Sequence, residues 1–300
     1  MQIVVVGGGA VGLLLASLLQ KDHTQMNILV HRETQASELN DKGLQQIDVL
    51  QQSHHTYIKA SHDFKVFPTD AIWIIAVKYH HLASLQSLFN SLPESTPLLF
   101  IQNGVKHFQF AKNLKQKHIA FSSVEFGAEK LSNSSVAHRG IGKMKTAIER
   151  GDGQPFKKFF QLSDSKLPIE WIENAEQMLI RKALLNCLIN SLTTILNVKN
   201  GYLITNKQSL ILLEKLYKEL MEAFPEQQDQ LLFEDVLALC TKTATNTSSM
   251  LTDRLNGRLM EVDTIVGGIL EIAQNRGHEM STLKTLYIIL MAVQQGGVER

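Results

Sequence analysis

The sequence contains little cysteine and has almost no net charge. Its 300 residues include two cysteines, Cys187 and Cys240, which lie far apart in apolar surroundings. Two isolated cysteines make neither a disulfide framework nor a zinc site, so we expect a reducing compartment, the cytoplasm, and no metal ion. Thirty basic and 29 acidic residues leave a formal charge of +1. Nucleic acids and anionic membranes bind clustered basic surfaces, so we expect neither as a partner.

Charge is also absent from the start of the chain. The first charged side chain is Lys21, so an apolar stretch nearly as long as a membrane span comes first. A secretory signal carries Lys or Arg ahead of its apolar core, and this stretch has none there. Glycines at positions 7, 8, 9 and 12 also interrupt it. We therefore expect a folded segment and not a membrane anchor.

The first half of the chain alternates between strand and helix patterns. Apolar runs typical of buried strands cover residues 2–6, 27–30, 71–77, 98–101, 120–124 and 169–172, and a helix pattern covers about 10–19. Such runs, separated by helices, indicate a parallel sheet covered on both faces. Residues 44–67 are polar with alternating apolar positions, which suits smaller strands. We predict an open α/β domain over residues 1–172.

After Trp171 the strand patterns stop and helical patterns take over. Helical periodicity covers residues 174–197, 207–223, 229–244, 261–275 and 282–294. We therefore predict an all-helical domain over residues 173–300.

A glycine-rich loop follows the first predicted strand and opens the first helix. It consists of Gly7, Gly8, Gly9, Ala10, Val11 and Gly12, which match the pattern G-x-G-x-x-G. In this pattern the first glycine allows a tight turn, the second lets the backbone approach a pyrophosphate, and the third lets helix and strand pack closely. The N–H groups of the helix N-terminus favour the negative charge. This context predicts a dinucleotide-binding, Rossmann-like domain with a doubly wound sheet.

The end of the second strand distinguishes NAD from NADP. About twenty positions after the last glycine, an acidic residue binds the ribose 2′-hydroxyl of NAD, whereas an arginine suits the 2′-phosphate of NADP. Arg32 occupies this place, with Glu33 one position further on. We favour NADP(H) as the cofactor. Because Glu33 is acidic, NAD remains an alternative cofactor. The alternative interpretation of Arg32 is a solvated charge at the end of a strand.

Two more polar residues follow strands, at the edge where open α/β sheets bind ligands. Lys78 follows the strand at 71–77, and Asn103 follows the strand at 98–101. Because Asn103-Gly104 is a common turn sequence, spacing alone favours a turn residue over a ligand residue at Asn103.

An apolar helix over 178–197 carries a polar stripe. Lys182, Asn186 and Asn190 recur at every fourth position and so share one side of the helix. A buried, uncompensated ammonium is costly, so the stripe faces either a polar partner or a wet cleft. The alternative is that Lys182 emerges at an exposed helix end and the asparagines bond to backbone. Periodicity alone favours neither interpretation.

Two later segments also contain notable polar residues or glycines. Small polar residues interrupt the helices at 245–249, and Glu261 and Asp263 open another helix, where either acid also suits the helix dipole. Gly267 and Gly268 weaken that helix, so we expect it to pack closely against another helix.

Together these residues resemble the ketopantoate reductase (2-dehydropantoate 2-reductase) family, whose members are NADPH-dependent enzymes of pantothenate biosynthesis. The resemblance spans almost the whole chain. It consists of the glycine loop, Arg32, Val77-Lys78, Gln102-Asn103-Gly104, Arg181-Lys182, Asn186, Asn190, Asn246-Thr247-Ser248-Ser249-Met250 and Glu261-Val262-Asp263. Many dehydrogenases share the glycine loop, whereas the Lys-Asn-Asn helix joined with the last two motifs is far more specific.

The resemblance implies a role for each of these side chains. Lys182 is implied as the general acid, and Glu261 as a carboxylate that orients the substrate. Arg32 and Lys78 would contact the NADP end, and Asn103 would lie beside the nicotinamide and the substrate. The carboxylate and hydroxyl of ketopantoate, a small 2-oxo acid, would be held by Asn186, Asn190, Asn246 and Ser249. The apolar C-terminal helices permit either a monomer or a homodimer.

The sequence departs from the family's usual pattern at three positions. Ile180 stands where the family often has Trp, Ser191 replaces the usual Pro, and Glu125 stands where neutral residues are usual. We expect the charge of Glu125 to oppose an anionic substrate. The alternative functions are a paralogue acting on another branched 2-oxo acid and a non-catalytic NADP(H)-binding sensor.

Overall fold

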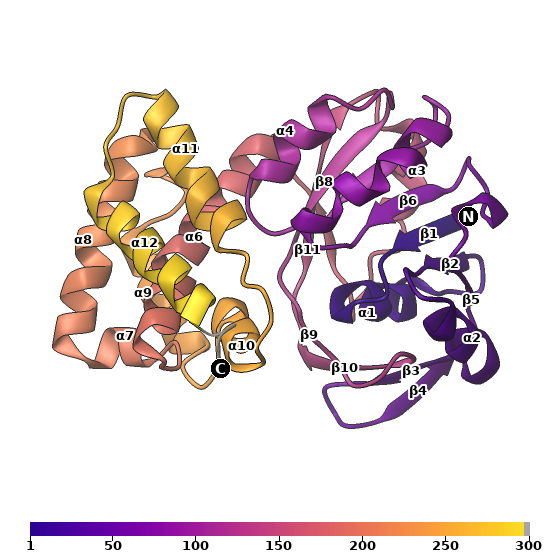
Figure 1. The fold of residues 1–300 in the computed structure, drawn as a ribbon, viewed down its shortest axis with the longest axis horizontal. Helices are drawn as coiled ribbons and strands as arrows, with labels where there is room; N and C mark the ends of the chain where they lie inside the picture. Colours follow the sequence, from indigo (N-terminus) through magenta and orange to yellow (C-terminus); the bar gives the residue numbers. More distant parts are fainter. Residues whose placement is uncertain (297–300) are drawn as a thin grey trace. The chain divides into compact units, whose positions relative to one another are not determined.

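The computed structural model describes residues 1–296, which form two compact units (Figure 1). The N-terminal unit contains Met1–Gln102 and His107–Met178. The helical unit contains the chain from Leu179 onward together with a short earlier segment, Asn103–Lys106. The structure thus divides inside a helix, α6 (Ala175–Leu196), and the domain limits of 172 and 173 stay a prediction.

An eight-stranded sheet forms the centre of the N-terminal unit, in the order β12-β11-β8-β7-β6-β1-β2-β5. Its strands are β1 (Gln2–Val6), β2 (Gln25–Leu29), β5 (Lys59–Ser61), β6 (Ile72–Ile75), β7 (Leu98–Phe100), β8 (Ile119–Val124), β11 (Met144–Arg150) and β12 (Ile169–Trp171). Neighbouring strands are parallel, which confirms the Rossmann-like prediction, except that β11 is antiparallel to β8. No crossover helix joins these two strands, so β11 can return in the opposite direction.

A second, four-stranded sheet has the order β4-β3-β10-β9. Its strands are β3 (Leu44–Ile47), β4 (Ser53–Thr56), β9 (Gly127–Lys130) and β10 (Ser135–Gly140). The sequence predicted the small strands within 44–67 but not β9 and β10, because those two carry charged and polar residues without an apolar run. Helix α1 (Ala10–Leu19) packs between this sheet and the larger one (Figure 1).

The charge-free start of the chain is part of the core of this unit. Four of the five residues of β1 are buried, and so are all residues of α1 from Gly12 to Leu19. A glycine loop separates the strand from the helix, so the segment is no continuous membrane helix. The remaining helices of the unit are α2 (Glu33–Lys42), α3 (Gln86–Ser91), α4 (Lys106–Lys112), which starts at the last residue of the docked segment, and α5 (Lys157–Phe160).

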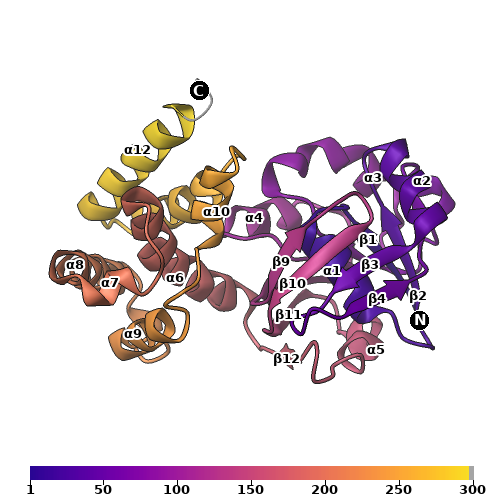
Figure 2. The same ribbon diagram turned by 90° about the horizontal axis from the view of Figure 1, so that it is seen from below.

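The helical unit is built around α6, which lies among the other helices in both views (Figures 1 and 2). Those helices are α7 (Tyr202–Thr205), α8 (Lys207–Ala223), α9 (Phe233–Lys242), α10 (Ser249–Leu255), α11 (Gly268–Asn275) and α12 (Ser281–Gly296). The five helical ranges predicted from the sequence are confirmed within a few residues. The range 261–275 differs in kind, because its first part, Asp263–Gly267, is a π-helical turn.

Within residues 1–296, α6 is the one helix whose length and apolar composition would allow it to cross a membrane. Sixty-seven per cent of its most apolar window is buried inside the protein. This burial is typical of a core helix, whose apolar side chains contact neighbouring helices instead of lipid.

Candidate active site

The glycine loop between β1 and α1 has the geometry that its pattern predicts. Gly7 has φ +118°, a conformation that L side chains rarely adopt. A Cβ at Gly12 would lie 2.0 Å from the Gly7 carbonyl oxygen, so helix and loop could not approach this closely with a larger residue. A Cβ at Gly9 would meet nothing within 4 Å, so its backbone is open to an approaching ligand.

The N-terminus of α1 fits a dinucleotide pyrophosphate. Gly9 is the N-cap residue, no side chain caps the helix, and its first turn contains no acidic residue. The positive end of the helix dipole is therefore not compensated by the side chains of its own first turn, which suits an anionic group.

The Gly8 carbonyl oxygen accepts two hydrogen bonds from residues that the sequence analysis did not single out. Gln35 Nε2 and Lys130 Nζ each donate to it at 2.9 Å. Arg32, the exposed N-cap residue of α2, donates from Nη2 to Asn133 Oδ1 at 3.0 Å. Burial and, to a smaller extent, the positive charge of Arg32 lower the pKa of Lys130. Lys130 and Asn133 belong to the unpredicted β9–β10 hairpin, so no sequence signal pointed to them.

The ends of β6 and β7 are tied together by Gln102, whose role the sequence analysis also missed. Its Nε2 donates to the carbonyl oxygens of Ile75 at 2.7 Å and Val77 at 2.9 Å. Lys78, half-buried, follows directly as the N-cap residue of a short 3-10 turn. The predicted Lys78 position is therefore held firmly at the carboxyl edge of the sheet.

Asn103 and Glu261 meet within the helical unit. Asn103 Nδ2 donates to Glu261 Oε2 at 2.9 Å, although the two residues are 158 positions apart. The side chain of Asn103 therefore does more than complete an Asn-Gly turn. This contact unites two residues to which the family resemblance gives roles at the reacting end of the substrate.

The position of Asn103 depends on how its segment docks on the π-helical turn. Gly104 has φ +82°, and a Cβ there would lie 2.2 Å from the Thr264 carbonyl oxygen. That same oxygen accepts a hydrogen bond from Val105 N at 3.1 Å. π-Helical turns are rare and occur often at functional sites. Here the turn presents a carbonyl that holds the Asn103–Lys106 segment.

Charged and aromatic side chains reinforce this docking. Lys106 Nζ lies 2.8 Å from Asp263 Oδ2, and Tyr287 on α12 donates to Asp263 Oδ1 at 3.2 Å. Burial and the nearby Asp263 carboxylate raise the pKa of Tyr287, so its hydroxyl stays protonated as a donor. The expected close packing at the glycine pair is also present: a Cβ at Gly268 would lie 2.5 Å from Val105, and one at Gly267 would lie 3.3 Å from Tyr287.

The polar stripe lies along the middle of α6, away from both ends of the helix. Lys182 and Asn186 are half-buried in a helix that is otherwise mostly buried, and Asn190 is 7% exposed. Asn190 Nδ2 donates to Ser249 Oγ at 3.4 Å. Of the two interpretations of the stripe, this contact fits the one in which it faces polar partners.

In the segment 245–249, Ser248 is buried and the other four residues are exposed. Ser248, which the sequence analysis gave no separate role, is the N-cap residue of α10 and shares a hydrogen bond of 2.9 Å with Thr193 on α6. Asn246 and Ser249 are exposed beside it. The structure therefore places Ser249 against Asn190 through the cap of α10.

Two of the departures from the family pattern are buried and one is charged. Ile180 is 1% exposed, and Ser191 is fully buried, with no hydrogen-bond partner for its Oγ among residues 1–296. Glu125 pairs with Lys145 at 2.7 Å. Its negative charge, expected to oppose an anionic substrate, is therefore largely balanced within the N-terminal unit.

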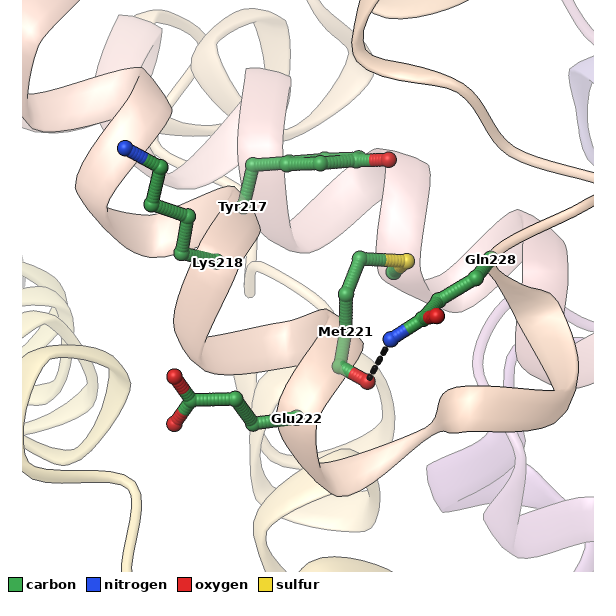
Figure 3. Close-up of a pocket in the computed structure, with 5 residues that line it drawn as sticks. All are labelled: Tyr217, Lys218, Met221, Glu222 and Gln228. Carbon is green, nitrogen blue, oxygen red and sulfur yellow. Dashed lines mark hydrogen bonds between the residues drawn. The ribbon is translucent and has the colours of Figure 1, made fainter.

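A shallow surface pocket lies elsewhere on the helical unit, along α8 and the turn that follows it (Figure 3). It is lined by Tyr217, Lys218, Met221, Glu222 and Gln228, and Gln228 Nε2 donates to the Met221 carbonyl at 3.2 Å. None of the predicted site residues lines this pocket. Among residues 1–296, no cluster of His, Cys, Asp and Glu is arranged to hold a metal ion.

The Rossmann-like fold of the N-terminal unit and its glycine loop are those of a dinucleotide-binding protein. The family model "Ketopantoate reductase PanE/ApbA" matches residues 3–150, and "Ketopantoate reductase PanE/ApbA C terminal" matches residues 174–294. The chain belongs to the ketopantoate reductase family, whose members are NAD(P)H-dependent reductases.

Individual relatives cover nearly the whole chain. The 2-dehydropantoate 2-reductase of Listeria monocytogenes is 32% identical over 98% of this chain and 97% of its own, and that of Bacillus subtilis is 31% identical over 98% of both. A solved structure named as a probable 2-dehydropantoate 2-reductase from Bacillus subtilis has a TM-score of 0.86 at 29% identity, covering 98% of this chain and 100% of its own. A ternary structure of D-mandelate dehydrogenase with NADH and anilino(oxo)acetate shares the fold, with a TM-score of 0.87 at 22% identity over 99% of this chain and 100% of its own.

We predict that Gly104→Ala displaces Asn103 from Glu261. The substitution combines about 1–2 kcal/mol of positive-φ strain with a backbone clash against Thr264, so unfolding free energy and kcat/KM should both fall. Urea denaturation and steady-state kinetics measure the two effects.

Gly277→Ala is the matched control, because Gly277 has φ +81° but a Cβ there meets nothing within 4 Å. Its unfolding free energy should fall by about 1–2 kcal/mol from φ strain alone, and its turnover should equal that of the wild type. Equal stability losses with equal turnover in the two variants would show that the docking of Gly104 on Thr264 has no role.

Proposed function

We propose that this protein reduces 2-dehydropantoate to pantoate with NADPH, a step of pantothenate biosynthesis, with Lys182 as the general acid. The observation that carries the proposal is the contact of Asn103 with Glu261, since it joins two residues of the family's motifs across 158 positions. The contact of Asn190 with Ser249 supports it, because these residues also come from separate motifs.

The glycine loop, Arg32 and Lys78 are proposed to bind the cofactor. Two observations support this assignment: Gly7, Gly9 and Gly12 leave the loop tightly turned and open at Gly9, and the first turn of α1 carries no acidic side chain to repel a pyrophosphate. Arg32 remains exposed at the N-cap of α2, where its bond to a neutral amide leaves its positive charge available for the 2′-phosphate. NADPH, when bound, supplies a hydride.

Lys182 is proposed to complete the reduction of the carbonyl. As hydride forms the new C–H bond at C2 of the substrate, the π electrons of the carbonyl move to its oxygen. An ammonium beside that oxygen stabilises the developing alkoxide and then transfers a proton to it, which yields the hydroxyl of pantoate. These interactions are strongest in the transition state, so they lower the barrier more than they strengthen substrate binding.

The remaining polar residues are proposed to hold the substrate. Asn186, Asn190, Asn246 and Ser249 offer neutral N–H and O–H donors, which satisfy a carboxylate without a bidentate arginine. Because Asn103 donates to Glu261 from Nδ2, its Oδ1 stays free to accept from the carboxamide of the nicotinamide. Glu261 is proposed to orient the substrate hydroxyl.

The two cysteines support a cytoplasmic location for this reaction. Cys187 and Cys240 are both free and buried. Burial raises the pKa of both thiols, that of Cys240 to about 11, so neither is a reactive thiolate. Reduced, inert thiols are typical of proteins in a reducing compartment.

Arg32→Ala should weaken NADPH binding by about 1.5–3 kcal/mol and leave NADH binding nearly unchanged, because only NADPH carries the 2′-phosphate. Fluorescence titration of both cofactors measures this difference. Arg139→Ala is the control, since Arg139 on β10 pairs with Glu129 at 2.6 Å. An equal loss for both cofactors, or a wild type that prefers NADH, would contradict the assignment.

Ketopantoate should exceed 2-oxoisovalerate in kcat/KM by about 10²- to 10⁴-fold. 2-Oxoisovalerate lacks the hydroxymethyl group, and a site that binds a hydroxyl leaves polar groups unpaired when the hydroxyl is missing. The decrease in NADPH absorbance at 340 nm measures both rates. Comparable rates would favour a paralogue with a broader set of branched 2-oxo acids.

Lys182→Ala should lower kcat by about 10²- to 10⁴-fold with little change in NADPH affinity, as expected for a general acid. Lys199→Ala, an exposed lysine just after α6, should retain wild-type turnover. Glu261→Ala should also lower turnover, and the double variant should lose less than the product of the two single losses, because the pair acts as a unit. A folded Lys182→Ala protein with near wild-type kcat would remove Lys182 from the mechanism.

A further inference from the structure

Lys130 contacts the glycine loop, and the sequence motifs assign it no role. It is the last residue of β9, in the smaller sheet, and its ammonium donates to the Gly8 carbonyl oxygen at 2.9 Å. Gln35 already donates to the same oxygen at 2.9 Å. Because one neutral donor satisfies a carbonyl, the structure of the loop alone does not require a positive charge here.

A short chain of hydrogen bonds connects Lys130 with Arg32. Arg32 donates to Asn133 Oδ1 at 3.0 Å, and Gln35 Nε2 donates to the Asn133 carbonyl at 2.9 Å as well as to Gly8. The positive charge of Arg32 acts on Lys130 and lowers the pKa of its ammonium, after burial as the larger cause. Two cations thus lie near one another, each bonded to a neutral oxygen.

The nearby carboxylate, Glu38, is held by other groups. It favours the charged form of Lys130 from a distance, but its oxygens accept hydrogen bonds from Asn133 Nδ2 at 3.2 Å and from Ser134 Oγ at 3.1 Å. Lys42 forms an ion pair with it at 3.5 Å. The position of Glu38 is therefore set by the β9–β10 hairpin and by its own helix, and Arg32 and Lys130 form no hydrogen bond to it.

We propose that Lys130 is a specificity-determining residue for the cofactor, which binds the 2′-phosphate of NADPH together with Arg32. This inference rests on the NADPH part of the proposed function. A phosphate monoester carries a charge of about −1.5 to −2 at pH 7, more than the single positive charge of Arg32 balances, and Lys130 adds a positive charge close to Arg32. Binding of the phosphate relieves the repulsion between Arg32 and Lys130.

The connections of Lys130 favour the 2′-phosphate over the pyrophosphate. The pyrophosphate suits the N-terminus of α1, which begins after Gly9. Lys130 instead shares the Gly8 carbonyl with Gln35, a residue in the first turn of the helix whose N-cap is Arg32. The β9–β10 hairpin belongs to the second sheet and contacts the glycine loop through Lys130. The hairpin thereby adds a second cation beside Arg32.

Two ligands that differ only in the 2′-phosphate test the proposal: adenosine 2′,5′-bisphosphate and adenosine 5′-monophosphate. Isothermal titration calorimetry on the full chain compares wild type with Lys130→Gln, which keeps an N–H donor for Gly8 and removes the charge. The variant should bind the bisphosphate about 10- to 100-fold more weakly and the monophosphate within about two-fold of wild type. Lys130→Arg should restore most of the lost affinity.

Lys117→Gln is the control, because Lys117 is an exposed lysine of the same unit that pairs with Glu94 at 2.9 Å. It should leave both affinities unchanged. An equal loss for both ligands in Lys130→Gln would assign Lys130 to the 5′-phosphate side, and unchanged affinity would leave it as a support of the loop; either result overturns the proposal.

The same titration separates this inference from the proposed function. A wild type that binds the two ligands equally would overturn the NADPH assignment itself. A wild type that prefers the bisphosphate, with the preference intact in Lys130→Gln, would overturn only the role of Lys130.

Discussion

The docking of the segment Asn103–Lys106 on the π-helical turn is the constraint on which the candidate site depends. The preceding residue, Gln102, is bonded to Ile75 and Val77 in the N-terminal unit. The segment itself is held by the Thr264 carbonyl, and only a glycine fits at position 104. Two consecutive residues are thus fixed by different units, and the side chain of Asn103 is directed to Glu261 as a consequence.

The π-helical turn explains how one short segment of helix can satisfy several demands. An α-helix pairs each backbone carbonyl with the N–H four residues on, whereas a π-helical turn shifts this pairing by one residue. Here the Thr264 carbonyl accepts from Val105, and Asp263 binds both Lys106 and Tyr287. Asp263 lies at the start of a helix, where an acid suits the helix dipole. It also anchors the distant segment Asn103–Lys106.

Because α6 is mostly buried, its polar residues need polar partners. Ala183, Leu184 and Cys187 are almost completely buried, so a lysine and two asparagines on the remaining side are energetically acceptable only with polar partners. Asn190 finds one in Ser249, which the cap of α10 holds in place through Ser248 and Thr193. The proposed function gives this stripe a role, because 2-dehydropantoate is a polar, anionic substrate.

The sequence by itself determined the strand-loop-helix around the glycines, most strands of the larger sheet and the long helices of the second half, because these follow from local periodicity and turn chemistry. The shorter helices α2, α3, α4, α5, α7 and α10 were not predicted. It also indicated Lys182, Asn186 and Asn190 as one stripe, since helical spacing alone places them on one side. Only the tertiary structure decided that Asn103 lies on Glu261, that β11 runs antiparallel to β8, and that Lys130 lies on Gly8. β9 and β10 have no apolar run to detect. They are stabilised by pairing with each other and, for β10, with β3. Contacts between distant residues depend on packing that no local pattern encodes.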